Sequence, residues 1–149
     1  MIKIIAVGKI KESFYKEAIC EYLKRISRYT KIEIIEVPDE PSEEKALRIE
    51  EERILKHIKD TDYVITLEIE GEVIKSLELA TKIDKLMITK PNITFVIGGS
   101  YGLGNSIKER SNYRLSFSKL TFPHQLFRVV LLEQIYRIYK IINNESYHK

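Results

Sequence analysis

The chain has 149 residues, of which 44% are hydrophobic and 32% charged, a balance typical of one globular domain and not of a disordered or fibrous protein. The most apolar stretch, residues 126–142, is interrupted by two arginines, a glutamate and a lysine, which excludes a membrane span there. We therefore expect a single domain over residues 1–149 with no membrane segment.

The net charge of +3 is unevenly distributed. Residues 105–149 carry 8 Lys or Arg against 3 Asp or Glu, a balance of +5, and the other residues carry 17 against 19, a balance of −2. A basic segment is compatible with a nucleic-acid partner, although an unevenly charged surface is the commoner explanation. The N-terminus shows no signal-peptide pattern and Cys20 has no partner cysteine, so we expect a cytoplasmic protein with Cys20 buried on a helix.

Strand-like and helix-like segments alternate through the first half. Residues 2–8 form a short aliphatic run, residues 11–29 have helical spacing, and residues 31–38 alternate as a strand that stops at a proline. In the turn that follows, Ser42 suits the N-cap of a second helix. The residues expected to form the apolar faces are Phe14, Ala18, Tyr22 and Ile26 in the first helix and Leu47, Ile54, Leu55 and Ile58 in the second.

The second half continues the alternation. The expected strands are residues 63–71, 92–99 and 113–118, and the expected helices are residues 73–89, 105–111 and 125–142. Strands that alternate with helices predict an α/β fold with a mostly parallel sheet flanked by helices.

The stretch FVIGGSYGLG, residues 95–104, holds four of the six glycines. A dinucleotide fingerprint reads G-x-G-x-x-G, whereas Gly99, Gly102 and Gly104 give the reverse order, and no lysine follows as in a phosphate-binding loop. A tight turn is the simpler explanation. So many glycines at the end of a strand favour close approach of the backbone to a ligand.

Three further features could carry chemistry. Glu68 and Glu70 could pair as catalytic carboxylates, although solvent-facing positions at the sheet rim are the commoner role. Residues 115–128, LSFSKLTFPHQLFR, combine hydroxyls, apolar walls and free backbone groups that suit a ring such as adenine, but Pro123 also fits an ordinary helix start. Tyr147 and His148 could cover a site, although terminal residues are usually frayed.

The last helix has apolar residues around most of its circumference. A helix that packs on one sheet face shows a single apolar stripe, so a second surface is needed, and we prefer a partner subunit over deep burial in a monomer. No His, Cys or Asp cluster has the spacing of metal ligands, so no metal is expected.

These segments together resemble the RlmH family of the SPOUT methyltransferases over the whole chain. The resemblance depends on AVGK at residues 6–9, TLEIEG at 66–71, the glycine stretch, LT-x-PH-x-L-x-R at 120–128, E-x-x-YR at 133–137, and the ending NESYHK. It implies a homodimeric α/β domain with a C-terminal trefoil knot. It also implies binding of S-adenosylmethionine and methylation of N3 of a pseudouridine in a stem-loop of 23S ribosomal RNA.

The resemblance also implies roles for individual residues. The cofactor contacts would be Leu67, Gly99, Ser118, Lys119, Leu120, Thr121, Phe122 and Pro123, and the residues on the RNA side would be Arg128, Tyr147 and His148. The family's glycine loop commonly reads GGPEG, whereas here Ser100 and Tyr101 replace the proline and the acidic residue.

The implied reaction needs N3–H to lose its proton, so His148 is a candidate base and Arg128 a candidate electrostatic stabiliser. Three alternatives stay open: a methyltransferase with another RNA target, a nucleotide-binding module without catalysis, and a scaffold dimer without a ligand.

Overall fold

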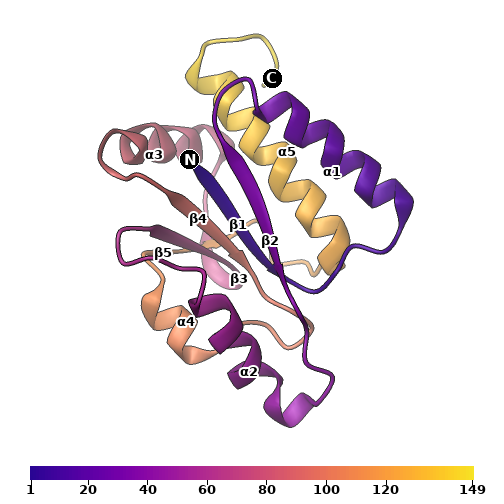
Figure 1. Ribbon diagram of the computed structural model, residues 1–149. Coiled ribbons are helices and arrows are strands. Elements are labelled where there is room, and N and C mark those ends of the chain that lie inside the picture. The colour runs from indigo at the N-terminus through magenta and orange to yellow at the C-terminus, as the bar shows by residue number, and fades with distance from the viewer.

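The computed structural model describes residues 1–149 and contains five strands that alternate with five helices (Figure 1). The elements are β1 (Ile2–Val7), α1 (Ser13–Ile26), β2 (Ile32–Val37), α2 (Glu43–Leu55), β3 (Tyr63–Val73), α3 (Ser76–Thr89), β4 (Ile93–Ile97), α4 (Asn105–Arg110), β5 (Tyr113–Ser116) and α5 (His124–Ile142).

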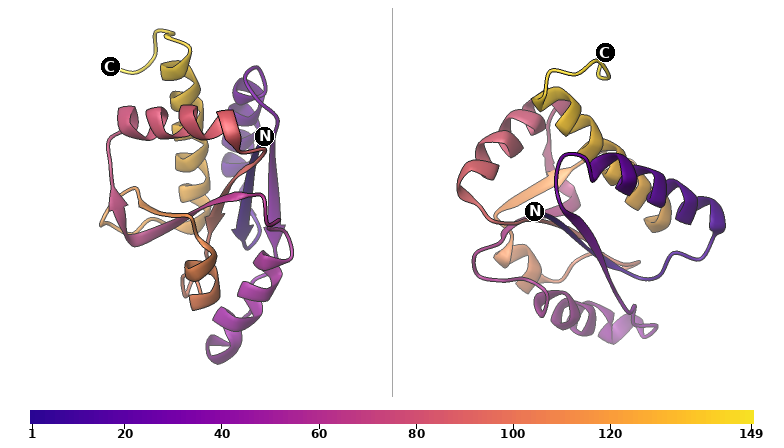
Figure 2. Two further views of the ribbon diagram at one scale, coloured as in Figure 1. Left: turned by 90° about the vertical axis from the view of Figure 1, so that its left-hand side faces the viewer. Right: turned by 45° about the horizontal axis from the view of Figure 1, so that its top comes forward.

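The five strands form one parallel sheet in the order β2-β1-β4-β3-β5. Helices α1, α5 and α3 cover one face of the sheet, and α2 and α4 cover the other (Figures 1 and 2). The predicted fold class, an α/β sandwich with a parallel sheet, is confirmed.

The central strands are apolar on both faces, because both faces are covered. All residues of β1 and β4 are buried. Ile4 and Phe95 belong to the core under α1, α3 and α5, while Ile5 and Val96 belong to a smaller core under α2 and α4. This alternation explains why both strands read as continuous hydrophobic runs in the sequence.

Strand β3 is longer than its partner β5, and their pairing shifts register between Leu67 and Glu72. Residues 68–71 therefore leave the regular ladder at the carboxyl edge of the sheet. The same edge receives the ends of β4 and β5, so three chain segments meet there.

The buried faces of the first two helices match the expected ones only in part: Ile26 and Ile54 are buried as expected, and Tyr22, Leu55 and Ile58 pack against the cores. In α1 the buried residues are Ile19 and Ile26, while Phe14 is 61% exposed and Cys20 is also exposed, so its predicted burial is wrong. In α2 the buried residues are Ala46, Glu50 and Ile54, while Leu47 is 39% exposed. Helical spacing is compatible with several neighbouring stripes of residues along each helix, and contact with the sheet decides which of these stripes is buried.

Helix α5 lies between α1 and α3 on the sheet (Figure 2). No residue from 125 to 142 is fully exposed, and Leu131, Leu132, Ile135 and Ile138 are buried. Much of its apolar circumference is thus covered within one chain.

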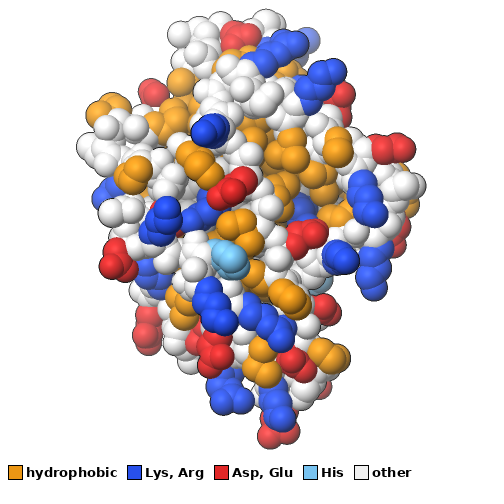
Figure 3. Space-filling view, viewed as in Figure 1, with side chains coloured by type: hydrophobic (Ala, Val, Ile, Leu, Met, Phe, Trp, Pro, Cys, Tyr) orange, Lys and Arg blue, Asp and Glu red, His pale blue; other side chains and the backbone are white.

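On the face that carries β2, hydrophobic side chains gather beside this edge strand and charged side chains surround them (Figure 3). None of the helices has both the length and the apolar composition needed to cross a bilayer.

Candidate functional site

A cavity of about 320 Å³ opens at the carboxyl ends of β3, β4 and β5. It is lined by the end of β3, the turn after β4, one side chain of α4, the segment after β5 and the first turns of α5. In open parallel sheets, ligands bind outside the carboxyl ends of the strands. The position of the cavity therefore marks it as the candidate ligand site.

The wall after β4 is a glycine turn, residues 98–104. The N–H of Gly102 donates to the carbonyl of Gly99 at 3.1 Å, and Gly102 has φ +81°, a conformation that favours glycine. A Cβ on Gly98 would lie 2.6 Å from the Gly102 carbonyl oxygen. A Cβ on Gly99 would lie 2.9 Å from Cγ1 of Val7. The turn can pack this tightly only because positions 98 and 99 carry no side chain; Gly98 and Gly99 are themselves buried.

Two adjacent carboxylates of α2 support the glycine turn from behind. Glu50 is 3% exposed, and its Oε2 accepts the N–H of Glu40 at 2.8 Å. Its Oε1 is buried without a hydrogen-bond partner, at 3.0 Å from the position of a Cβ on Gly99. Glu51 accepts the N–H of Ser106 at 3.0 Å and so holds the start of α4. The wall is thus backed by α2 and not by solvent.

The opposite wall is the segment between β5 and α5. Ser116 Oγ donates to the carbonyl of Ser118 at 3.0 Å, and the Ser118 Oγ accepts the N–H of Leu120 at 2.9 Å. The ring of Phe127 packs against Phe117 and Phe122, with centroids at 5.2 and 6.2 Å. Hydrogen bonds thus fix the backbone of this segment, and three packed aromatic rings form the floor of the cavity beside it.

A charged cluster borders the cavity at the end of β3. Glu68 Oε1 and Oε2 accept hydrogen bonds from Arg114 at 2.7 and 2.9 Å, and Oε2 also accepts one from Thr66 at 2.7 Å. Burial opposes ionisation of Glu68, but the bonds from Arg114 and Thr66 outweigh it and lower its pKa. The expectation that Glu68 and Glu70 both face solvent is therefore wrong for Glu68, which is 9% exposed, and right for Glu70.

The fold brings most of the expected cofactor residues to this cavity. Lys119 and Pro123 do not line it: Lys119 Nζ donates to the carbonyl of Ile69 at 3.0 Å, and Pro123 precedes α5. The expected residues that do line it are Leu67, Gly99, Ser118, Leu120, Thr121 and Phe122.

The three candidate catalytic residues lie outside this cavity in the single chain. Arg128 is 3% exposed and forms an ion pair with Glu36 of β2. Tyr147 donates its hydroxyl to Glu133 at 2.9 Å, and His148 Nδ1 lies 3.0 Å from Arg137 Nη1. Burial, then the bond to Glu133, raises the pKa of the Tyr147 hydroxyl, which therefore stays protonated.

Sequence reasoning missed two residues of this site. Glu50 lies on the buried stripe of α2 with Ala46 and Ile54, and the i, i+4, i+8 spacing of these three residues could have placed it there. Lys108 of α4 lines the cavity, but no sequence signal separates it from other surface lysines. No group of His, Cys, Asp and Glu side chains is arranged to hold a metal ion.

Comparison with known proteins gives consistent matches over the whole chain. The family model described as "Predicted SPOUT methyltransferase" matches residues 1–148. A relative in Methanococcus maripaludis strain C5 is 58% identical over 157 aligned residues, covering 99% of each chain. A Clostridium botulinum strain 657 relative, named "Ribosomal RNA large subunit methyltransferase H", is 54% identical with the same coverage. A solved structure described as a probable methylase family protein from Haemophilus influenzae Rd KW20 has a TM-score of 0.57 at 20% identity, covers 99% of this chain and 70% of its own, and so supports the fold alone.

Proposed function

Because this chain belongs to the SPOUT methyltransferase family and is a ribosomal RNA methyltransferase, we propose that it methylates N3 of a pseudouridine in a stem-loop of 23S ribosomal RNA, with S-adenosylmethionine as methyl donor. The observation that carries the proposal is the cavity at the carboxyl edge of the sheet, in a chain that matches relatives of this name from end to end.

The cavity fits the proposed cofactor in size and chemistry. Its volume of about 320 Å³ lies in the range of small-molecule sites, and its lining mixes apolar side chains with backbone groups. S-adenosylmethionine, whose sulfonium supplies an electrophilic methyl group, would be held by the expected residues that line the cavity: Leu67, Gly99, Ser118, Leu120, Thr121 and Phe122. Gly99 lines the cavity with backbone atoms, since Val7 and Glu50 fill the space on its Cβ side, and the ring of Phe127 forms the floor.

The chain's own residues must orient N3 and favour loss of its proton. We assign His148 as the base, with Tyr147 beside it, and Arg128 as the electrostatic stabiliser. In one chain the tail is bound to Glu133 and Arg137 on α5. His148 must therefore either leave these partners or serve the cavity of a second chain.

We further propose a homodimer, which would supply the second chain. Half-buried apolar residues on α5, including Val129, Val130 and Tyr136, support a covering surface beyond α1 and α3. The basic residues 105–149 would contact RNA phosphates, which predicts salt-dependent binding. With a ribosomal substrate, the protein would act in the cytoplasm. Family membership also predicts a trefoil knot in its C-terminal part.

The proposal is tested by mass spectrometry of 23S ribosomal RNA from a strain that lacks this gene. We expect one N3-methylated pseudouridine to disappear and to return when the wild-type gene is restored. Purified protein with S-adenosylmethionine should modify ribosomes from the deletion strain. Loss of a different methylated nucleotide would identify another RNA target, and cofactor binding without any methylated product would indicate a non-catalytic module.

A further inference from the structure

Exposed apolar side chains cluster at the mouth of the cavity. Nine large hydrophobic side chains of the chain are exposed, and three of them, Ile69, Tyr101 and Leu120, line this one cavity. They are 44%, 43% and 74% exposed and come from β3, the glycine turn and the segment after β5. Apolar side chains gathered at a cavity mouth indicate a binding surface.

Tyr101 is presented by a rigid backbone although its side chain is free. It occupies the third position of the turn closed by the Gly99–Gly102 hydrogen bond, and the close packing of Gly98 against Gly102 restricts that turn. The Tyr101 hydroxyl forms no hydrogen bond within the chain, and its ring stacks on no other ring. An aromatic side chain on a fixed turn offers a large contact area at a low cost in conformational entropy.

The other two residues of the mouth are also fixed through their backbone. Leu120 is held by its N–H bond to Ser118 Oγ at 2.9 Å. Ile69 is held through its carbonyl, which accepts Lys119 Nζ at 3.0 Å. The backbone of all three residues is therefore fixed at the cavity, which places a preformed apolar contact surface there.

The charges around the mouth favour an anionic partner. Lys108 lines the cavity and Lys119 lies at its edge, and neither forms an ion pair. Arg114 neutralises Glu68, which leaves Glu70 as the unpaired carboxylate there. Two unpaired cations against one unpaired anion suit a ligand that carries phosphates beside an apolar ring.

We propose that Tyr101, with Ile69 and Leu120, forms a stacking subsite for an unpaired nucleobase of the RNA substrate. The inference rests on the proposed function and adds to it a contact for the base at the entrance of the cavity. Bases in single-stranded loops are held by stacking on aromatic side chains, which tolerates any base identity.

The experiment compares Tyr101→Ala, Tyr101→Phe and Tyr101→Leu with the wild type. Binding of a fluorescein-labelled pseudouridine stem-loop RNA is measured by anisotropy, and KM and kcat are measured on ribosomes from the deletion strain. We expect Tyr101→Ala to weaken RNA binding and raise KM about tenfold, the equivalent of a stacking contribution of about 1.4 kcal/mol. Tyr101→Phe should match the wild type because it keeps the aromatic ring. Tyr101→Leu keeps an apolar side chain but has no aromatic face to stack on, so it should resemble Tyr101→Ala.

The controls separate this subsite from the rest of the protein. Ile88→Ala removes an equally apolar side chain on α3 that is 83% exposed and lies outside the cavity, and it should change nothing. Affinity for S-adenosylmethionine is measured by calorimetry in the same variants, because Tyr101 lines the cofactor cavity. Tyr101→Ala should weaken cofactor binding less than RNA binding, and an equal loss of both would overturn the inference. Unchanged RNA binding in Tyr101→Ala overturns the inference. Equal RNA affinities of Tyr101→Leu and Tyr101→Phe also overturn it, as does a Tyr101→Ala protein whose main defect in sedimentation is loss of a dimer. Failure of the wild type to methylate RNA overturns the proposed function instead.

Discussion

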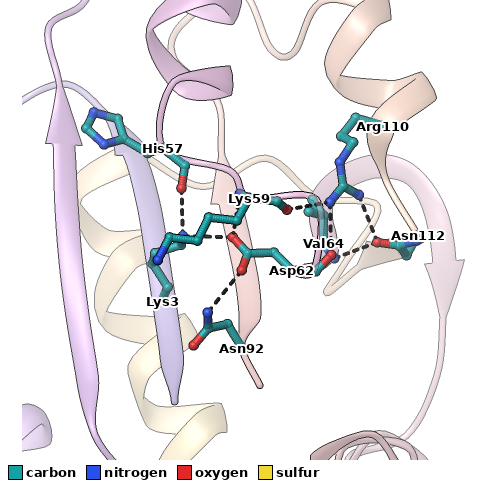
Figure 4. Close-up of polar contacts among 8 residues, drawn as sticks. All are labelled: Lys3, His57, Lys59, Asp62, Val64, Asn92, Arg110 and Asn112. Carbon is teal, nitrogen blue, oxygen red and sulfur yellow. Dashed lines mark hydrogen bonds and ion pairs between the residues drawn. The ribbon is translucent and has the colours of Figure 1, made fainter. Parts of the chain in front are cut away.

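The two ends of the parallel strands are built in opposite ways; we call them the amino edge and the carboxyl edge of the sheet. At the amino edge, buried charges form a hydrogen-bonded network, whereas at the carboxyl edge a cavity is lined by backbone groups and exposed apolar side chains. Figure 4 shows the amino-edge network, in which the ammonium of Lys3 lies between the carbonyl of His57 and the carboxylate of Asp62.

Asp62 is the centre of the amino-edge network. Its carboxylate accepts bonds from Lys3 Nζ at 2.8 Å, from the N–H of Lys59 at 3.0 Å and from Asn92 Nδ2 at 3.1 Å. Burial opposes its ionisation, yet these bonds outweigh burial and lower its pKa. Arg110 completes the network by donating to the carbonyls of Lys59 and Asp62 at 3.0 and 2.9 Å.

The difference indicates that the amino ends of the strands contribute to stability and that the carboxyl ends serve ligand binding. A network whose groups satisfy one another has nothing left to offer a ligand, and removing a member leaves a buried charge. A cavity lined by exposed side chains and backbone groups contributes less to stability but can bind a ligand. Substitutions in the amino-edge network should therefore change stability alone, and substitutions of residues that line the cavity should change ligand binding.

The largest effect is expected from Asp62→Ala, which leaves the Lys3 ammonium buried without its partner. We expect a loss of about 3–5 kcal/mol in the free energy of unfolding, measured by urea denaturation. The folded fraction should bind S-adenosylmethionine with wild-type affinity. The double variant Lys3→Met/Asp62→Ala should recover part of the stability, and weakened cofactor binding in the folded protein would contradict the division between the edges.

Gly99→Ala should act on binding. The added methyl group would meet Val7 Cγ1 at 2.9 Å and Glu50 Oε1 at 3.0 Å, so the cavity wall must shift. We expect about tenfold weaker binding of S-adenosylmethionine in calorimetry, equivalent to about 1.4 kcal/mol. Val7→Ala/Gly99→Ala removes one of the two clashes and should bind more tightly than Gly99→Ala, while equal affinities would show that the clash is not the cause.

Arg114→Ala tests the charged cluster beside the cavity through pH. Because the pKa of Glu68 is lowered in the folded state, the ion pair stabilises the protein above the ordinary carboxyl value of 4.5 and this contribution is lost as pH falls through the folded-state pKa. Without Arg114, burial acts with less opposition, so acid unfolding should begin at a higher pH. Circular dichroism during acid titration measures the midpoint, and Arg25→Ala, on the far surface of α1, is the matched control.

The smallest effect is expected from Ser42→Ala. Ser42 is the N-cap of α2, but its side chain forms no capping hydrogen bond. We therefore expect a change within about 0.5 kcal/mol in the free energy of unfolding, where a bonded cap would contribute about 1 kcal/mol. A larger loss in urea denaturation would show that the cap forms in solution.

The order and type of the ten elements could be predicted from the sequence, because the strands are short apolar or alternating segments and the helices have helical spacing. The glycine turn could be predicted as a close-packed wall, since glycines clustered after a strand have few other uses. The buried faces of α1 and α2 could be predicted only in part. Ile26 and Ile54 are buried as expected, but Phe14 and Leu47 fit the helical period as well as Ile19 and Ala46 do. Only contact with the sheet decides among such stripes.

The cavity itself was only partly predictable. Leu67, Gly99 and the segment after β5 are recognisable by motif, and the fold brings them together. The pairing of Glu68 with Arg114 was not, since it depends on β5 lying beside β3, a pairing between residues 46 positions apart. Sequence spacing carries no information on such contacts.

The position of β1 inside the sheet has a consequence for how the chain is made. Its register pairs Ile2 with Ile32 on one side and with Ile93 on the other. During synthesis, the first partner is available early, but the second emerges only when most of the chain has been translated. Until then the inner edge of β1 stays unpaired, and the centre of the sheet can close only late, with slow pairing between distant segments. A nascent chain of this protein therefore needs protection of its first strand until β4 arrives.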